Sequence, residues 1–215
     1  MWKSEIDATG CVMLDERRAK HVREVLKAEA GDTLKAGFVN GAFAEATVIE
    51  MDEAQCIVAL RETGEPLPPP PTIDVLLAMP RPRFLDRILP QLPPLGVRRL
   101  FLCDSVRVEK HYFGSQLLKR ENFLPVLVEG AEQSGQTIIP EVRIDLNLRR
   151  LLSDIVPDYD AGAKFLAHPD NSNHRMEGER PREPLLLAIG CEGGWVDSEI
   201  ALFDTHAHFH ELCRY

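Results

Sequence analysis

Several features are scarce or missing in this 215-residue sequence. Its five cysteines are odd in number and never form a Cys-x-x-Cys pair, which argues against a disulfide framework and favours a reducing compartment. No apolar run approaches the roughly 20 residues that a membrane-spanning helix needs. The first ten residues also lack the apolar core of a signal peptide. We therefore expect a cytoplasmic protein without a membrane partner.

An excess of positive charge is missing too. The 25 Lys and Arg residues are outnumbered by 34 Asp and Glu residues, which gives a formal net charge of −9. Proteins that bind nucleic acid mainly through their overall field are usually basic. Any RNA partner would therefore have to bind a local basic patch. The hydrophobic content of 44% is ordinary for a globular protein, and the length allows one large domain or two small ones.

Short segments of alternating hydrophobicity fill residues 1–65. The apolar stripe of Asp15–Leu26 predicts a helix, and Asn40-Gly41 is a strong hairpin signal. Strands are predicted at Cys11–Leu14, Leu34–Val39, Ala42–Ile49 and Cys56–Leu60. One helix with several short antiparallel strands is typical of a small β-barrel domain.

Residues 66–71 read Pro-Leu-Pro-Pro-Pro-Pro. Proline has no backbone N–H and a fixed φ, so this run favours a stiff, extended spacer over a helix interior or a central strand. We place the domain boundary here. The first domain is then 1–65, the linker 66–71 and the second domain 72–215.

From Thr72 onwards, apolar strands alternate with helical segments. Strands are predicted at Ile73–Met79, Val97–Cys103, Glu141–Ile144, Ala163–Ala167 and Leu185–Ile189. Helices are predicted at Phe84–Leu92, Phe113–Lys119, Asn122–Gly135, Leu148–Ile155 and from Asp197. This alternation predicts an α/β domain whose mostly parallel sheet is covered by helices on both faces.

A glycine-rich turn follows the last of these strands. The segment Gly190–Gly194 reads Gly-Cys-Glu-Gly-Gly, and Asp197-Ser198-Glu199 then resembles a helix start. Glycines let backbone N–H groups approach a ligand, and α/β domains bind ligands in loops that follow buried strands. A tight structural turn is the alternative.

Charged and polar residues gather near the predicted strand ends. Arg81 and Arg83 follow the first strand of the second domain and could bind phosphate together, although a solvated face also explains each of them. Glu132 and Gln133 end a helix that is apolar upstream, and their side chains could line a pocket. His168 ends a strand at a ligand-edge position, with mere exposure as the alternative.

Alternate histidines occur near the end of the sequence. On a strand, His206, His208 and His210 would share one face and could bind zinc. The His-x-His pair also resembles the metal motif of amidohydrolases of the TatD type, but in that family the motif opens a (β/α) barrel. A zinc hydrolase using His206 and His208 is therefore a lesser alternative. We expect the end of a helix and its exit loop here, and no metal.

Several short motifs follow one another in a characteristic order over nearly the whole chain. They are His21–Leu26 with Gly31-Asp32, Leu95–Val97, Glu132–Gly135 with Pro140-Glu141, His168-Pro169, and Ile189–Gly194 with Glu199. In this order and spacing the sequence resembles the bacterial 16S ribosomal RNA uridine-N3 methyltransferase family (RsmE type) of the SPOUT superfamily. That family usually has proline where Cys191 stands, a Thr-Glu pair where Pro93-Pro94 stand, and often serine near Val196.

The resemblance also implies a later motif, Leu-Gly-x-Arg-Ile-Leu-Arg-x-Glu-Thr-Ala, which these 215 residues do not contain. In the family this motif supplies the adenine-side loop, an arginine near the chemistry and the helix that completes the knot. A catalytically incomplete, RNA-binding relative is therefore the alternative to an active enzyme.

For the fold, the resemblance implies a PUA-like, RNA-binding β-barrel followed by a SPOUT-type α/β domain with a parallel sheet and a C-terminal trefoil knot. It implies S-adenosylmethionine as methyl donor, 16S ribosomal RNA or the small ribosomal subunit as partner, and a homodimer with its active site near the subunit interface. The donor pocket would be lined by Leu166, His168, Ile189, Gly190, Glu192, Gly193 and Gly194.

The same resemblance places the remaining candidate residues toward the RNA. Candidate RNA contacts are Arg17, Arg18, Lys20, Arg23, Arg81 and Gln133. Uracil N3 carries a proton, so the reaction needs a group that accepts it or stabilises the anion. Glu132 is our candidate base or orienting group, and Arg83 is our candidate anion stabiliser.

Overall fold

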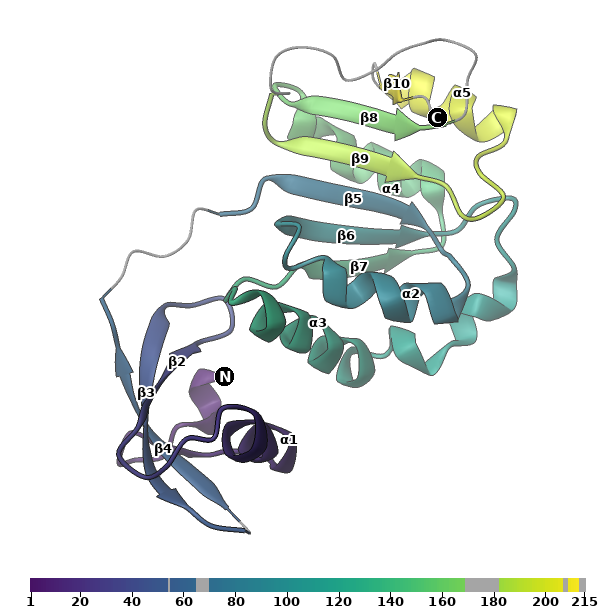
Figure 1. Ribbon diagram of the computed structural model, residues 1–215. Helices are drawn as coiled ribbons and strands as arrows, with labels where there is room; N and C mark the ends of the chain where they lie inside the picture. Colours follow the sequence, from purple (N-terminus) through teal and green to yellow (C-terminus); the bar gives the residue numbers. More distant parts are fainter. Residues whose placement is uncertain (54, 65–69, 169–181, 207–208, 213–215) are drawn as a thin grey trace. The chain divides into compact units, whose positions relative to one another are not determined.

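The computed structural model describes residues 1–53, 55–64, 70–168, 182–206 and 209–212 (Figure 1). The chain forms two compact units, Met1–Pro69 with Gly135–Ile138, and Pro70–Ser134 with Ile139–Tyr215. The division between Pro69 and Pro70 falls inside the proline-rich stretch 66–71, most of which lies outside the described residues. The sequence did not indicate that 135–138 would join the first unit.

Antiparallel strands build the first unit. Its sheet has the order β1-β4-β3-β2 and consists of β1 (Cys11–Met13), β2 (Thr33–Gly37), β3 (Phe43–Met51) and β4 (Cys56–Glu62). Asn40 adopts a positive φ of 53° between β2 and β3, as the hairpin signal predicts. Within the described part of the chain, the end strands β1 and β2 do not pair with each other. The pairing therefore gives a four-stranded sheet, and the PUA-like barrel remains a proposal.

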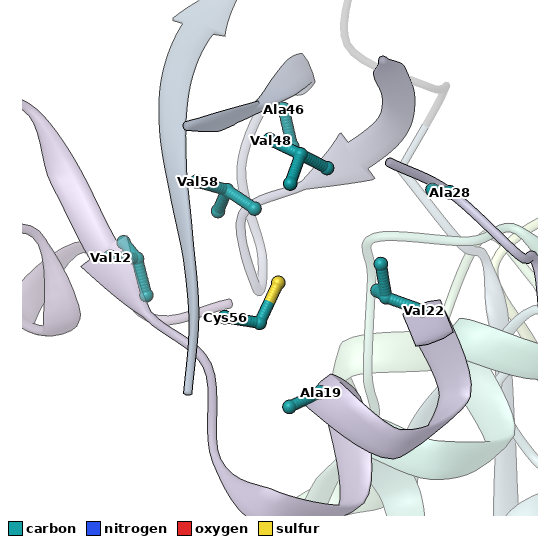
Figure 2. Packing of buried hydrophobic residues seen from close by; sticks show 8 residues of the cluster. All are labelled: Val12, Ala19, Val22, Ala28, Ala46, Val48, Cys56 and Val58. Atoms are coloured by element: carbon teal, nitrogen blue, oxygen red, sulfur yellow. The ribbon is translucent and has the colours of Figure 1, made fainter. Parts of the chain in front are cut away.

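A small apolar core joins the helical segment of this unit to its sheet. A 3₁₀ turn, Lys3–Glu5, precedes the sheet; α1 (Glu16–Lys20) continues into a π-helical turn at His21–Val25. Asp15 caps α1 by accepting a hydrogen bond from the Arg18 N–H at 2.8 Å. The core of this unit consists of Val12, Ala19, Val22, Ala28, Ala46, Val48, Cys56 and Val58 (Figure 2).

Parallel strands build the second unit, as predicted. Its sheet has the order β10-β8-β9-β5-β6-β7, with every neighbouring pair parallel. The strands are β5 (Ile73–Ala78), β6 (Val97–Cys103), β7 (Glu141–Asp145), β8 (Ala163–Ala167), β9 (Leu185–Ile189) and β10 (His210–Leu212). This order is not sequential, because β9 lies between β8 and β5 and the chain returns to place β10 outside β8.

Helices cover both faces of this sheet. In Figure 1, α2 (Pro82–Ile88) and α3 (Arg120–Ser134) lie in front of the sheet, and α4 (Leu148–Ile155) lies behind it, where it packs against α5 (Asp197–His206). Two 3₁₀ turns extend helices, Leu89–Gln91 after α2 and Val156–Tyr159 after α4. In the described part of the chain, no helix is both long and apolar enough to cross a membrane.

Two expectations about local structure were wrong. The segment Phe113–Lys119 was predicted as a helix, but the structure has separate 3₁₀ turns at Lys110–Gly114 and Gln116–Leu118, with an extended Ser115 between them. Helix α5 was expected to end in an exit loop, whereas the chain adds the short strand β10. That strand gains its hydrogen bonds from β8, a partner that local sequence does not reveal.

A buried ion cluster fixes the amino edge of the parallel sheet. Asp74 in β5 is fully buried and accepts hydrogen bonds from Arg98 at 2.9 and 2.5 Å, from Arg99 at 2.9 Å, and from the Tyr159 hydroxyl. Burial alone would raise the pKa of Asp74, but these hydrogen bonds outweigh it and lower the pKa. Asp74 is therefore an anion that joins β5, β6 and the segment before β8.

Candidate active site at the carboxyl edge of the sheet

The strand order reverses direction at β5. From β5 the chain adds β6 and β7 on one side, whereas β9 pairs with β5 on the other side. Parallel α/β sheets bind ligands at the carboxyl ends of strands next to such a reversal. The segment Gly190–Gly194 follows β9 directly at this edge. We call this segment the glycine loop.

The glycine loop is a tight turn that depends on two of its glycines. The Gly194 N–H donates to the Cys191 carbonyl at 2.8 Å, and Gly194 has a φ of +72°, which favours glycine. A Cβ added to Gly190 would lie 2.9 Å from the Gly194 Cα and 3.1 Å from the Trp195 nitrogen. The two ends of the loop therefore lie so close together that any larger residue at position 190 would force them apart.

Contacts from neighbouring loops hold the glycine loop in place. The backbone N–H of Arg81, which follows β5, donates to Glu192 Oε1 at 3.1 Å. The guanidinium of Arg107, in the turn after β6, donates to the Gly193 carbonyl. The carboxyl ends of β5, β6 and β9 are thus joined around this loop.

Buried polar atoms without a hydrogen-bond partner are concentrated at the same edge. Within the described residues they are Asp104 Oδ1, Ser105 Oγ, His168 Nδ1, Trp195 Nε1 and, in the first unit, Thr137 Oγ1. The first four follow β6, β8 or β9. Since buried polar groups are nearly always hydrogen-bonded, this concentration suits a site that a polar ligand completes.

The residues predicted to bind the cofactor lie around this edge. Ile189 ends β9, and His168 directly follows β8. Leu166 in β8 is 1% exposed and pairs with Ala188, so its side chain belongs to the core next to the loop. Gly190, Glu192, Gly193 and Gly194 form the loop itself. The tertiary structure therefore brings together all seven of these predicted residues.

Arg83 and Arg81 also lie at this edge. Arg81 directly precedes α2, and Arg83 is an exposed residue of the first turn of this helix, with its guanidinium 4.9 Å from the centre of the Phe84 ring. Arg81 lies near Tyr112, whose hydroxyl donates to Glu109 Oε1 at 2.8 Å. That hydrogen bond to Glu109 raises the pKa of Tyr112 and keeps it a neutral donor.

Glu132 and Gln133 lie elsewhere in the second unit. They are exposed residues in the last turn of α3, and Gln133 Nε2 donates to Glu129 Oε1 at 3.2 Å. Helix α3 runs back toward the amino ends of the strands (Figure 1), where Gly130 packs on the Pro90 backbone shortly before β6 begins. The chain therefore does not bring Glu132 or Gln133 together with Arg83 and the glycine loop.

The candidate RNA contacts of the first unit lie on α1 and the turn after it. Arg17 and Lys20 are exposed, and Lys20 lies 4.0 Å from Glu24. Arg18 is less available because it binds Asp15 at 2.6 Å and Glu5 at 2.5 Å. Arg23 donates to the Asp52 carbonyl at 2.9 Å. Arg17 and Lys20 are therefore the more exposed of these candidates, and Arg18 and Arg23 are partly buried.

The histidines that suggested zinc lie near the end of the chain. His206 is the last residue of α5, and His208 lies outside the described residues. No group of three or more His, Cys, Asp or Glu side chains that could hold a metal ion occurs in the described part of the chain.

Comparison with known proteins agrees with this geometry. Residues 68–212 match the family described as "RNA methyltransferase domain". The chain belongs to this family. It is also similar to "Ribosomal RNA small subunit methyltransferase E" of Treponema pallidum, with 30% identity over 95% of this chain and 79% of that protein. A second relative, "Ribosomal RNA small subunit methyltransferase E 1" of Borreliella burgdorferi, is 23% identical over 87% of this chain and 78% of that protein.

A solved structure has the same fold as this RNA methyltransferase family member. The ribosomal RNA small subunit methyltransferase E of Neisseria gonorrhoeae, solved bound to S-adenosyl methionine, aligns with a TM-score of 0.77 over all of this chain and 88% of its own length. Its identity to this chain is 18%, so this likeness concerns the fold. The predicted α/β class and the resemblance to the family are thus confirmed.

Three residues of the site were not among the sequence-based candidates. Glu199 was noted as part of a motif, but no role was assigned to it. The other two are Arg107 and Tyr112. Their positions depend on contacts between loops far apart in the sequence. The sequence signal available for Glu199 was its place in the third position of a helix that follows a glycine turn.

Proposed function

We propose that this protein methylates N3 of a uridine in small-subunit ribosomal RNA, with S-adenosylmethionine as the methyl donor. The observation that carries the proposal is the glycine loop at the carboxyl edge, in a chain that belongs to the RNA methyltransferase family. The names of the relatives support the substrate, and the cytoplasm is where we expect the reaction. The PUA-like first domain, the homodimer and the trefoil knot belong to the same proposal.

The residues present fit the implied cofactor. The glycine loop leaves little side-chain bulk at the edge, and the buried His168 Nδ1 offers a nitrogen that has no hydrogen-bond partner among the described residues. We assign His168, Ile189, Gly190, Glu192, Gly193 and Gly194 to the cofactor pocket, and Leu166 to the core directly behind it. S-adenosylmethionine supplies an activated methyl group when bound. The protein then contributes mainly by positioning the two reactants.

Arg83 is our candidate for stabilising the uracil anion. It is exposed at the first turn of α2, on the edge that holds the glycine loop. The target base must leave the RNA stack to reach this edge. As its N3 proton leaves, a nearby guanidinium lowers the energy of the negative charge that develops. Arg81 at the start of the same helix, and Arg17, Arg18, Lys20, Arg23 and Gln133 elsewhere, are our candidate RNA contacts.

Glu132 can serve as the proton acceptor only from a second subunit. Within one chain it belongs to the last turn of α3, a helix that ends toward the amino edge of the sheet, whereas Arg83 belongs to the first turn of α2, which follows the carboxyl end of β5. A symmetric dimer that brings α3 of one subunit to the carboxyl edge of the other would complete the site. This arrangement would also explain an active site near a subunit interface.

A direct assay tests the function. Small ribosomal subunits that lack the modification are incubated with the protein and labelled S-adenosylmethionine, and digested RNA is analysed by mass spectrometry. We expect N3-methyluridine at one position. Absence of cofactor binding in calorimetry would leave only the RNA-binding alternative, and a different methylated nucleoside would refute the substrate.

Two variants test the assigned roles. R83M should lower kcat about a hundredfold, as expected for loss of one charge-stabilising donor. R87M, an exposed arginine of the same helix, is the matched control and should keep wild-type activity. Equal loss in both variants would exclude a specific role for Arg83.

Mixed dimers test the origin of Glu132. E132Q and R83M should each be nearly inactive alone. After mixing and subunit exchange they should recover about a quarter of wild-type activity, because half of the dimers are hybrids and each hybrid has one intact site. No recovery would mean that Glu132 does not act across the interface.

A further inference from the structure

Glu199 is a buried carboxylate that the proposed reaction does not use. It is 5% exposed and lies in the first turn of α5, just after the glycine loop. Both of its oxygens accept backbone hydrogen bonds, Oε2 from Val196 at 3.0 Å and Oε1 from Val106 at 2.8 Å. Because its oxygens are occupied and buried, Glu199 is poorly suited to accept a proton from a substrate.

The two hydrogen bonds of Glu199 have different consequences. The bond from Val196 is the ordinary capping interaction in which the third residue of a helix binds the N-cap amide. The bond from Val106 is not needed for the helix, since Val106 lies in the turn after β6, 93 residues earlier in the chain. This second bond attaches that turn to the start of α5.

Arg107, the next residue of the same turn, makes a second attachment. Its guanidinium donates to the Gly193 carbonyl, and its aliphatic part covers Gly193, where an added Cβ would lie 3.0 Å from the Arg107 Cδ. The turn itself is closed by the Val108 N–H, which donates to the Ser105 carbonyl at 3.1 Å. The turn after β6 therefore contacts the glycine loop at Gly193 and the segment that follows it at Glu199.

We propose that Glu199 and Arg107 are positioning residues that hold the glycine loop in the conformation that binds the methyl donor. The proposal rests on the proposed function, because the ligand is the cofactor assigned there. A loop that is already ordered loses less conformational entropy on binding, so fixing it in advance increases affinity. Glu199 acts through Val106 and Arg107, and we assign it no contact with the cofactor.

Binding and hydrogen exchange test this proposal in the full chain. E199Q keeps the size of the side chain but replaces one acceptor oxygen with an amide that faces an N–H donor. R107M keeps the aliphatic part and removes the donor, whereas R107K restores a donor. The controls are N147A, which removes the side-chain cap of α4, and K110A, an exposed lysine close to Arg107 in sequence that pairs with Asp104.

We expect E199Q and R107M each to raise the Kd for S-adenosylmethionine about tenfold in calorimetry, and R107K to recover most of the affinity. Without cofactor, the same two variants should accelerate amide exchange in segments 104–109 and 190–196. N147A should lower thermal stability without changing affinity or exchange there, and K110A should resemble the wild type. Because Glu199 and Arg107 act through the same turn, the double variant E199Q/R107M should bind S-adenosylmethionine only slightly more weakly than the more impaired of the two single variants.

Wild-type affinity in E199Q and R107M, or unchanged exchange in both segments, would overturn the proposal. A loss of affinity in N147A equal to that in E199Q would also overturn it, because general destabilisation would then be the cause. If the wild-type protein itself does not bind S-adenosylmethionine, the proposed function fails instead. The exchange measurement still reports on the attachment in that case.

Discussion

Replacing Gly190 with alanine is a direct test of the glycine loop. The added Cβ would lie 2.9 Å from the Gly194 Cα, 3.0 Å from its carbonyl carbon and 3.1 Å from the Trp195 nitrogen. Favourable contacts between carbon atoms begin at about 3.5 Å, so the two ends of the loop must separate by roughly half an ångström or more. All three neighbouring atoms belong to the backbone, so no side chain can rotate away to relieve the overlap.

The cost of this overlap follows from comparable changes in packed sites. Inserting a methyl group where nothing can yield costs about 1–3 kcal/mol. If the loop opens to relieve the overlap, it must close again to bind the cofactor, and the free energy of cofactor binding becomes less favourable by this amount. Each 1.4 kcal/mol corresponds to about a tenfold change in Kd, so G190A should bind S-adenosylmethionine about ten to a hundred times more weakly.

Two further alanine variants make the test specific. An added Cβ at Gly193 meets the flexible Arg107 side chain, so G193A should lose less affinity than G190A. An added Cβ at Gly114 meets nothing within 4 Å, so G114A should bind like the wild type. Calorimetry gives each Kd, and thermal melting checks that each variant is folded. Wild-type binding by G190A, or equal losses in all three variants, would refute the role given to the loop.

The amino edge of the sheet gives the remaining predictions. D74N should lower the free energy of unfolding by about 2–4 kcal/mol in urea titrations, because it leaves partly buried arginines without their anion. The control D158N changes an exposed partner of Arg99 and should lower it by under about 1 kcal/mol. Equal losses of stability in D74N and D158N would contradict a special role for the buried Asp74. The pKa of Asp74 is lowered on folding, so its contribution should be complete above about pH 4 and decline as the pH falls below that value, whereas D74N should show a weaker acid dependence. G130A should lower the melting temperature, because its Cβ would overlap the Pro90 carbonyl oxygen and separate α3 from the turn after α2; an unchanged melting temperature would argue against this packing.

Local patterns in the sequence predicted many of the elements. The bounds of β6, β8, β9 and α4 agree with the predicted ranges Val97–Cys103, Ala163–Ala167, Leu185–Ile189 and Leu148–Ile155. Strands buried on both faces have continuous apolar runs, and a helix on such a sheet has a clear apolar stripe. The prediction failed at 113–119, where apolar spacing resembled a helix but Ser115 is extended. Spacing alone cannot detect a break that a single residue makes.

The sequence by itself determined the type of each unit and the place of the glycine loop after a buried strand, because these depend on residues close together in the chain. Only the tertiary structure decided that β9 lies beside β5, that Glu199 binds Val106, and that α3 ends toward the amino edge of the sheet. Such arrangements depend on which distant segments pack together, and the free energy of that packing is not encoded in the periodicity of any one segment.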